Sequence, residues 1–420
     1  MASVPSSNGT AASTEREKTC RRNHENQPIK QEKDFMINLF IEIKKRAHLW
    51  YIIRRVFLLP GIKDLRLKKI NSEIRNAKYI HLMYNDKFNK GFVDFINKHF
   101  IGKEHTILCL RRCYDRKSTP FPYAFNVYEI FGFNGIQIDP APQQKIIVHS
   151  LNDDETVDFL YTHKQILKNV FWLIWGMDLY NLAKDPRRIF LAQQIPYYIT
   201  DVDGDGSVAR KKFNVSPKIF HSGYSFPITG KMIKNAALFR EKKAKQKTGL
   251  RIQINHSADE STLEMLDILA GFNSPEVEVV TILSYGQLEY KEAIIEKGRK
   301  LFGDRFSFLD KMLSPADYAK FLSLSDILIL NQNRQQGLGN SFASLALKLK
   351  LFIRSDITTY KFFTSHGIHI FPTEEISRMS FQEFTEHSKE DIDAQVSLVQ
   401  KFFDDSYLAE LWKPIFEEVL

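Results

Sequence analysis

The sequence predicts an α/β protein with two successive domains, each built around a mostly parallel sheet. Its 420 residues are about the length of two ordinary domains. Short apolar runs typical of strands alternate with amphipathic runs typical of helices, which is the pattern of a parallel sheet covered by helices. This alternation occurs twice. A polar, lysine-rich stretch at 229–249 separates the two series and is interpreted as an interdomain linker.

Two further segments are predicted before these domains. Residues 1–34 are polar and rich in Ser, Thr and Asn, which predicts a disordered tail. Residues 35–78 form a basic extension in which apolar side chains recur at helical spacing from Met36 to Trp50. Such an amphipathic helix can lie in the plane of a membrane surface or pack on the protein itself. Pro60 is expected to end this helix, and 61–77 to form a connector.

The first predicted domain spans 79–247 and starts at a strand-type run, 78–83. Its other strands are predicted at 106–110, 145–150, 170–175 and 196–200, and its helices at 86–100 and 157–167. The second predicted domain spans 248–420. Its strands are predicted at 250–254, 277–283, 306–309, 325–330 and 351–353, and its helices at 259–270, 290–302, 315–323, 341–348 and 390–418. Ser314 followed by Pro315 is a typical helix start, because serine caps the first turn and proline lacks an N–H that would go unpaired there.

The positive charge is concentrated in the N-terminal extension. Residues 1–78 hold 17 of the 59 Lys and Arg residues and 8 of the 50 Asp and Glu residues, so the rest of the chain is electrically neutral. A nucleic-acid-binding protein would carry its cations on the folded domain, and nucleic acid is therefore not expected as a partner. A basic, apolar leader instead favours an anionic membrane surface or an anionic lipid-linked substrate.

Cysteine content and hydropathy suggest a cytoplasmic protein. The three cysteines, Cys20, Cys109 and Cys113, cannot all pair, which favours a reducing compartment with free thiols. No run reaches about 18 uncharged apolar residues, and the first residues lack the order of a signal peptide, so no membrane span is expected.

The decapeptide 331–340, NQNRQQGLGN, is the clearest candidate for a ligand site. It lies between an apolar strand-type run and a helical run, where an α/β sheet presents backbone N–H groups to anions. It also carries Arg334, whose guanidinium suits phosphate. These features favour a diphosphate site, although a glycine-rich turn without a ligand remains an alternative. The residues assigned to this site are Arg334, Gln335, Gln336, Gly337, Gly339 and Asn340.

Two other turns of the second domain are candidates for the same ligand. Asn255 and Ser257 follow the strand 250–254 and can donate to a phosphate at the start of the next helix. Alternatively, Ser257 simply caps that helix in a capping box with Glu260. At the end of the strand 277–283, the candidates for nucleoside binding are Ser284, Tyr285 and Gly286. Tyr285 could stack on a base, or could be an ordinary turn residue.

The candidate catalytic bases lie in the first domain. Asp178 follows a strand and a glycine, where a carboxylate can accept the proton of an acceptor hydroxyl. Alternatively, Asp178 caps the following helix. His81 is a second candidate, because the unperturbed pKa of histidine lies near neutrality.

One acidic motif resembles a metal site. Residues 201–207, DVDGDGS, begin like a calcium loop, but the twelfth position is Lys212 where a bidentate Glu is required. The Asp-x-Asp pattern in this stretch can hold the metal of a nucleotide sugar in other proteins. Overall, no metal site and no cofactor are predicted.

Together these segments resemble glycosyltransferase family 56. The resemblance rests on Trp-x-x-Trp-Gly-x-Asp-Leu-Tyr at 172–180, Asn-x-Ser-x-Asp at 255–259 and Arg-Gln-Gln-Gly-x-Gly at 334–339, and it covers about 79–410. It implies a GT-B architecture, in which two Rossmann-like domains face each other across a cleft. The second domain would bind the donor nucleotide and the first the acceptor, without a metal.

The resemblance also implies a reaction. A family member transfers N-acetylfucosamine from dTDP to a polyprenyl-diphosphate-linked oligosaccharide during cell-surface polysaccharide biosynthesis. By this resemblance the chain would act at the cytoplasmic face of the inner membrane as a peripheral protein. A non-catalytic nucleotide-sugar or lipid-binding protein of the same fold is the alternative.

Overall fold

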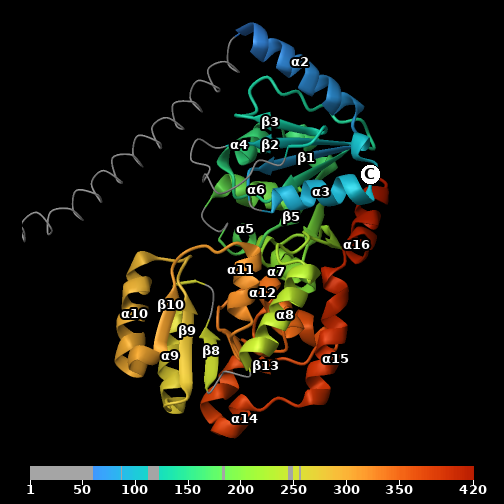
Figure 1. The fold of residues 1–420 in the computed structure, drawn as a ribbon. Helices are drawn as coiled ribbons and strands as arrows, with labels where there is room; N and C mark the ends of the chain where they lie inside the picture. The colour runs from blue at the N-terminus through green and yellow to red at the C-terminus, as the bar shows by residue number, and fades with distance from the viewer. Residues whose placement is uncertain (1–59, 87, 112–122, 182–184, 245–248, 255–256) are drawn as a thin grey trace, which may run out of the picture. The chain divides into compact units, whose positions relative to one another are not determined.

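The computed structural model of the chain describes residues 60–86, 88–111, 123–181, 185–244, 249–254 and 257–420 (Figure 1). The chain divides between Ile70 and Asn71, and the part from Asn71 onward contains two parallel β-sheets. We call the first sheet with its helices the first lobe, and the second sheet with its helices the second lobe. The predicted tail and the amphipathic segment 35–59 lie outside the described residues.

Helix α2 (Pro60–Asn76) occupies the segment that was expected to be a connector. Pro60 is the first residue of α2, where proline is tolerated because the first helical position needs no backbone N–H donor. The helix that Pro60 was expected to end lies outside the described residues. The last turn of α2 is fixed by Asn71. Its side chain donates to the carbonyl of Gly135 over 3.0 Å and accepts from the backbone N–H of Gln137 over 3.0 Å.

The first lobe contains a seven-stranded sheet in the order β3-β2-β1-β4-β5-β6-β7. All of its neighbouring strands pair in parallel. The strands are β1 (Tyr79–Tyr84), β2 (His105–Leu110), β3 (Val127–Ile130), β4 (Lys145–His149), β5 (Val170–Ile174), β6 (Tyr197–Thr200) and β7 (Lys218–His221). The helices are α3 (Asn89–His99), α4 (Asp154–Thr162), α5 (Met177–Tyr180), α6 (Pro186–Gln194) and α7 (Asp203–Phe213), with short 3-10 turns at Gly102–Glu104 and Lys164–Asn169.

The second lobe contains a six-stranded parallel sheet in the order β10-β9-β8-β11-β12-β13. Its strands are β8 (Leu250–Ile254), β9 (Val277–Ile282), β10 (Phe306–Leu309), β11 (Ile327–Leu330), β12 (Lys350–Ile353) and β13 (Phe371–Pro372). Its helices are α8 (Gly230–Ala244), α9 (Glu260–Leu269), α10 (Leu288–Phe302), α11 (Pro315–Leu322), α12 (Leu338–Ala346), α13 (Thr358–Ser365), α14 (Phe381–Thr385) and α15 (Lys389–Gln400). The predicted α/β class with mostly parallel sheets is confirmed.

The lysine-rich stretch 229–249 is not an open linker over most of its length. Helix α8 fills it, and Ile233 and Ala236 of this helix are buried in the core of the second lobe. Helix α8 also packs against α11. In the sequence, lysines are interspersed with these buried positions, so the apolar pattern of the helix is hard to recognise. The segment that joins the lobes is therefore short, from the end of β7 to the start of α8.

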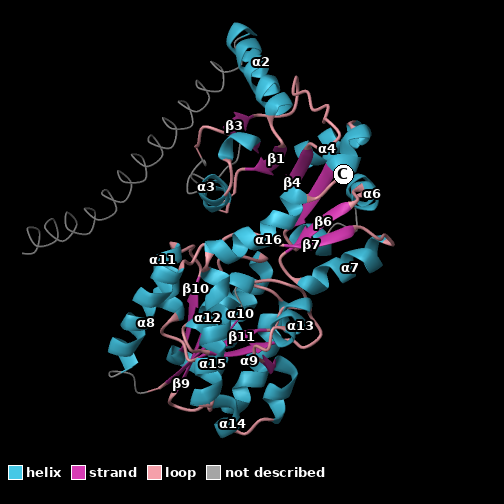
Figure 2. Ribbon diagram, turned by 90° about the vertical axis from the view of Figure 1, so that its right-hand side faces the viewer, coloured by secondary structure: helices cyan, strands magenta, loops and turns pink. Residues whose placement is uncertain are grey.

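The chain returns to the first lobe at its carboxyl end. The predicted helix 390–418 is two helices, α15 and α16 (Asp405–Glu417), with a 3-10 turn at Lys401–Phe403 between them. Helix α15 packs against α12, whereas α16 packs against α3 and β7 (Figure 2). Trp412 of α16 is fully buried, and its indole N–H donates to the carbonyl of Gly223 over 3.0 Å. The last helix thus belongs to the core of the first lobe.

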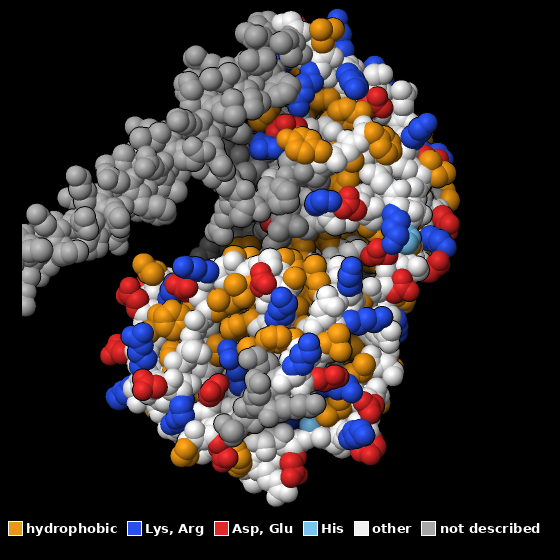
Figure 3. Space-filling model, in the orientation of Figure 1, with side chains coloured by type: hydrophobic (Ala, Val, Ile, Leu, Met, Phe, Trp, Pro, Cys, Tyr) orange, Lys and Arg blue, Asp and Glu red, His pale blue; other side chains and the backbone are white. Residues whose placement is uncertain are grey.

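The surface charge agrees with the balance in the sequence. Lys and Arg side chains alternate with Asp and Glu over the face shown in Figure 3, without a patch of one sign. Among the described helices, none combines the length and the apolar character that a membrane crossing needs.

Three histidines form a chain inside the first sheet. His81 on β1 is fully buried, and its ring nitrogens contact His149 on β4 over 3.0 Å and His105 on β2 over 2.9 Å. The ring of His149 also contacts the hydroxyl of Tyr224. Burial lowers the pKa of His105 and of His149 to about 3. These imidazoles are therefore neutral at physiological pH.

This burial predicts acid sensitivity. In the unfolded chain His105 titrates near its ordinary pKa of about 6.5, so its contribution to stability is complete above that pH and is lost as pH falls toward 3. Between pH 6 and pH 5, the free energy of unfolding of the wild type should fall by about 1.4 kcal/mol more than that of His105→Gln. Urea unfolding at both pH values measures the difference. Equal losses in the two proteins would mean that His105 is protonated in the folded state.

Candidate functional site

The predicted diphosphate turn lies between strand β11 and helix α12, as expected. Gly337 precedes α12 in the left-handed conformation, with φ of 71°, which an L-residue with a side chain rarely adopts. No side chain caps this helix. Its first N–H groups, those of Leu338, Gly339 and Asn340, therefore face the end of the turn without a side-chain acceptor, and a helix terminus of this kind attracts anions.

Arg334 is half-buried in this turn. Its guanidinium donates to the carbonyl of Gln335 over 3.3 Å. Burial lowers the pKa of Arg334, while the charge of Asp259 opposes that shift. Asp259 belongs to the turn after β8, so the guanidinium lies within electrostatic reach of that turn.

The turn after β8 is held by Asp259. Asn255 lies outside the described residues, whereas Ser257 is buried and donates its hydroxyl to the Asp259 carboxylate over 2.7 Å. The N-cap of α9 is Asp259, without a side-chain cap bond, so the capping box of Ser257 with Glu260 does not form. The start of α9 is consequently a second helix N-terminus without a side-chain cap. For Ser257 to donate to a phosphate, its hydroxyl would have to leave Asp259.

The predicted nucleoside turn is joined to this one. Gly286 forms an isolated parallel bridge with Ala258, and the Ala258 N–H donates to the carbonyl of Tyr285 over 2.7 Å. Gly286 has φ of 104°, and a side chain there would collide with the backbone of Ala258. The Tyr285 side chain is 38% exposed, so part of its ring is open to a base, while Ser284 lies beside it in the turn. The second lobe thus brings together all three turns that the sequence singled out.

Asp178 does not face an open cleft. It is fully buried, and one carboxylate oxygen accepts from the Leu151 N–H over 3.0 Å and from the Trp172 indole over 2.8 Å. The other oxygen accepts from the Trp175 N–H over 2.8 Å. Burial raises the pKa of Asp178, and these hydrogen bonds oppose that shift. The carboxylate ties the turns after β4 and β5 together, which is a positioning role.

His81 also lies away from any substrate. It is enclosed by the first sheet, and both of its ring nitrogens are engaged by other histidines. Burial, and to a lesser extent those two histidines, lower its pKa well below the ordinary value. We therefore do not propose Asp178 or His81 as the general base, because neither side chain is accessible to an acceptor hydroxyl.

The first lobe contacts the diphosphate turn directly. A side chain at Gly176 would collide with Gln335, and Gly176 has φ of 81°. The hydroxyl of Tyr180 donates to Asp205 over 2.8 Å, and the hydroxyl of Thr358, from the second lobe, donates to the same oxygen over 2.6 Å. Burial raises the pKa of Asp205 to about 6. These contacts place the predicted diphosphate turn against the carboxyl edge of the first sheet.

The acidic motif 201–207 is not a loop. Strand β6 ends at Thr200, just before Asp201, and helix α7 begins at Asp203, so the first acid follows a strand and the other two lie in a helix. Within the described residues, no group of three or more His, Cys, Asp or Glu side chains is arranged to hold a metal ion.

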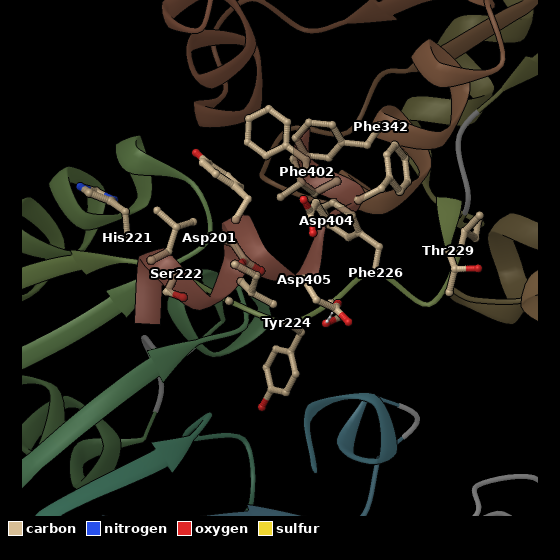
Figure 4. Close-up of a pocket in the computed structure, with 18 of the residues that line it drawn as sticks. Asp201, His221, Ser222, Tyr224, Phe226, Thr229, Phe342, Phe402, Asp404 and Asp405 are labelled. Carbon is tan, nitrogen blue, oxygen red and sulfur yellow. Dashed lines mark hydrogen bonds between the residues drawn. The ribbon is translucent and has the colours of Figure 1, made fainter. Parts of the chain in front are cut away.

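A cavity of 440 Å³ lies next to this region, and the sequence reasoning did not find it. Its polar wall comes from the first lobe and includes Asp201 and Ser222, at the ends of the neighbouring strands β6 and β7. Its aromatic wall comes mainly from the second lobe and from the turn before α16; it includes Phe226, Phe342 and Phe402 (Figure 4). The strand-end position of Asp201 was the available signal, and it was interpreted as part of a calcium-type pattern.

The family comparison agrees with the resemblance found in the motifs. The family model described as 4-alpha-L-fucosyltransferase glycosyl transferase group 56 matches residues 139–418. None of the curated proteins matches the chain.

Solved structures share the fold at low sequence identity. A UDP-forming alpha,alpha-trehalose-phosphate synthase from Burkholderia xenovorans has 11% identity and a TM-score of 0.58, covering 82% of this chain and 99% of that one. Anabaena Alr3699/HepE, in complex with UDP and glucose, has 10% identity and a TM-score of 0.54, covering 80% and 98%. A glycosyltransferase from Rickettsia africae ESF-5 has 9% identity and a TM-score of 0.54, covering 82% and 99%. The fold is thus the GT-B fold, as predicted.

Proposed function

The chain belongs to the family described as 4-alpha-L-fucosyltransferase glycosyl transferase group 56, and it is a glycosyltransferase; we propose that it moves an acetamido-dideoxyhexose such as N-acetylfucosamine from dTDP to a polyprenyl-diphosphate-linked oligosaccharide. The choice of sugar and of lipid-linked acceptor is supported by the motifs at 172–180 and 334–339, which resemble those of the family. In this proposal the second lobe binds the donor nucleotide and the first lobe binds the acceptor, with 79–247 and 248–420 as the two predicted domains.

The observation that carries the proposal is that the turns after β8, β9 and β11 lie at one edge of the second sheet, with Arg334 within electrostatic reach of Asp259. The N-cap residue of α12, Gly337, makes no side-chain bond to the helix start, and a diphosphate oxygen bound there would accept from the first N–H groups of α12. Arg334 adds a guanidinium that is half withdrawn from water, where its attraction for an anion is stronger. Tyr285 offers a ring face to the base.

The same groups can assist the transfer step. When the bond from the sugar to the diphosphate breaks, the bridging oxygen takes the electron pair and becomes negative. Donors already placed around that oxygen stabilise the transition state more than the ground state. Arg334, the first turn of α12 and Ser257 are the groups that we assign to this task, together with Gln335, Gln336, Gly337, Gly339 and Asn340 as the turn that forms the cradle.

A screen of activated sugars tests this function. The purified chain is mixed with dTDP-, UDP- and GDP-linked sugars, with and without a polyprenyl-diphosphate-linked oligosaccharide, and free nucleotide is measured. We expect acceptor-dependent release with a dTDP-linked acetamido-dideoxyhexose. Acceptor-dependent release only from a UDP- or GDP-sugar would reject the dTDP donor. A thermal shift with the donor but no release with any acceptor would instead indicate the non-catalytic alternative.

We further propose that the basic N-terminal extension holds the enzyme at an anionic membrane surface on the cytoplasmic side. Residues 1–78 carry a net excess of nine cations, and such a segment is attracted to anionic headgroups. Deleting residues 1–59 removes the predicted amphipathic segment and five of these nine net positive charges, so it should strongly reduce sedimentation with phosphatidylglycerol vesicles at about 0.1 M salt. The thermal midpoint should stay unchanged. Vesicles of phosphatidylcholine alone are the control. Undiminished sedimentation of the truncated protein would place the membrane contact elsewhere.

A further inference from the structure

The cavity beside the diphosphate turn contains a carboxylate without a partner. Asp201 borders the cavity and is exposed to it, and no described residue forms a hydrogen bond or an ion pair with its carboxylate. A side chain at Gly223 would collide with the Asp201 carboxylate, so glycine there leaves the room that the carboxylate occupies. The nearby Asp203 differs from Asp201, because its carboxylate pairs with His221 over 3.1 Å.

A second polar group in the same wall also lacks a partner. Ser222 is 3% exposed, and its hydroxyl has no hydrogen-bond partner among the described residues. A buried hydroxyl without a hydrogen bond lowers the stability of the fold unless a ligand or a water molecule bonds to it. Ser222 and Asp201 follow adjacent parallel strands, because Thr200 and His221 are register partners. The two groups therefore stand side by side at the carboxyl edge of the sheet, where ligands of α/β proteins bind.

The opposite wall is aromatic. Phe342 of α12 packs edge-on against Phe363 and in a tilted arrangement against Phe226 and Phe402, with ring centroids 4.5–5.0 Å apart. A ligand with hydroxyl groups on one side and C–H groups on the other matches these two walls, and a pyranose has that character. The space of 440 Å³ is enough for a sugar unit.

The cavity adjoins the proposed donor site without being part of it. Leu338, in the first turn of α12, lines the cavity, and a side chain at Gly339 would lie 3.4 Å from Phe226. The predicted nucleotide-binding residues Ser257, Tyr285 and Arg334 do not line it. The cavity therefore shares the α12 wall with the diphosphate cradle and has room for a second substrate.

Asp201 can exchange a proton near neutral pH. Although it borders the cavity, protein atoms surround the carboxyl group, and this burial, followed by the charge of Asp205, raises its pKa to about 7. Asp205 in turn accepts a hydrogen bond from Tyr180 over 2.8 Å.

We propose that this cavity is the subsite for the acceptor sugar and that Asp201 is the catalytic residue that removes the proton from the attacking hydroxyl; this inference rests on the proposed glycosyl transfer. The acceptor oxygen forms a bond to the anomeric carbon of the donor while its proton passes to a carboxylate oxygen of Asp201. The bond from that carbon to the diphosphate breaks, and its electron pair stays on the diphosphate oxygen next to Arg334. Ser222 binds another hydroxyl of the same sugar.

The test compares Asp201→Asn with a matched variant, Asp94→Asn, which removes the same charge from an exposed position on α3, in the same lobe but outside the cavity. Asparagine has nearly the shape of the protonated carboxyl, so the fold should tolerate it. We expect Asp201→Asn to lower the kcat of sugar transfer at least about 100-fold, the usual contribution of a general base. Its Kd for dTDP should stay unchanged. Asp94→Asn should change kcat by less than about threefold.

Ser222→Ala gives a second test of the acceptor subsite, which is independent of Asp201 as the catalytic base. Because the hydroxyl has no hydrogen-bond partner within the described part of the chain, its removal breaks no hydrogen bond seen there. The KM for the acceptor should rise about three- to tenfold, with kcat and the KM for the donor unchanged. An unchanged acceptor KM, or wild-type turnover by Asp201→Asn, would overturn this inference while leaving the glycosyltransferase function intact. Failure of the wild type to transfer sugar to any lipid-linked acceptor would overturn both.

Discussion

Arg334→Ala should lower the kcat for sugar transfer about 100- to 1000-fold, the range seen when a preorganised donor to a developing oxyanion is removed. The guanidinium is half-buried, and its one hydrogen bond to a described residue, the bond to the carbonyl of Gln335, is long at 3.3 Å. It is therefore free to turn to a stronger acceptor. A departing diphosphate is such an acceptor, because charge-assisted bonds to phosphate are short and strong.

The loss should fall on kcat more than on donor KM, since the charge on the bridging oxygen develops only as the bond breaks. Arg334→Lys keeps the charge but loses the planar fork, and we expect an intermediate loss. Arg354→Ala is the matched control, because that guanidinium lies in the same lobe and bonds Asp356 over 2.7 Å and 3.0 Å. Wild-type turnover by Arg334→Ala in a steady-state assay would mean that the leaving group is stabilised elsewhere.

Asp178→Asn should lower the free energy of unfolding by about 2–4 kcal/mol, since a buried acceptor of three N–H groups is replaced by an amide with an N–H group of its own. At least one of the donors from Leu151, Trp172 and Trp175 is then left facing another donor. The turn after β5 should loosen, and with it the contact of Gly176 with the diphosphate turn.

Urea unfolding measures this loss, and Asp404→Asn is the control. Asp404 caps α16 with one oxygen at 2.8 Å from the Ser406 N–H, and asparagine caps helices about as well as aspartate. We expect that control to lose less than about 1 kcal/mol. If Asp178→Asn kept wild-type stability and lost only sugar transfer, the original interpretation of Asp178 as the general base would be restored.

The turns of the second lobe could be predicted because their signals are local. An apolar strand run, a glycine-bearing polar turn and a helical run follow one another at 327–346, and the same order occurs after β8. Parallel strands then bring the turns to one edge of the sheet. For this reason the sequence was sufficient to group Ser257, Gly286 and Arg334.

The features that could not be predicted depend on contacts between residues that are far apart in the chain. Nothing within the sequence around Asp178 shows that Trp172 and Leu151 will enclose its carboxylate, and a strand-end acid looks the same whether it is buried or open. His81 is enclosed by two histidines from other strands, which only the strand order brings together. Helix α16 packs on the first lobe although it follows the second in the chain, and so its place cannot be inferred from neighbouring residues.

The local sequence around Asp201 suggested a site that the fold does not form. Its spacing to Asp203 and Asp205 is the spacing of the first acids in a calcium loop. However, strand β6 ends before the first acid and helix α7 begins at the second, so the three acids do not lie on one loop. The cavity that Asp201 borders is completed by Phe342 and Phe402, more than a hundred residues later in the chain.

The most direct measurement is the structure of the protein with dTDP bound. We predict diphosphate oxygens within about 3 Å of the Arg334 guanidinium and of the first N–H groups of α12, with the thymine against Tyr285 and the Asp201 cavity free of nucleotide. A diphosphate bound in the Asp201 cavity, with Arg334 still bonded to the Gln335 carbonyl, would contradict the assignment of the leaving group to the second lobe's cradle.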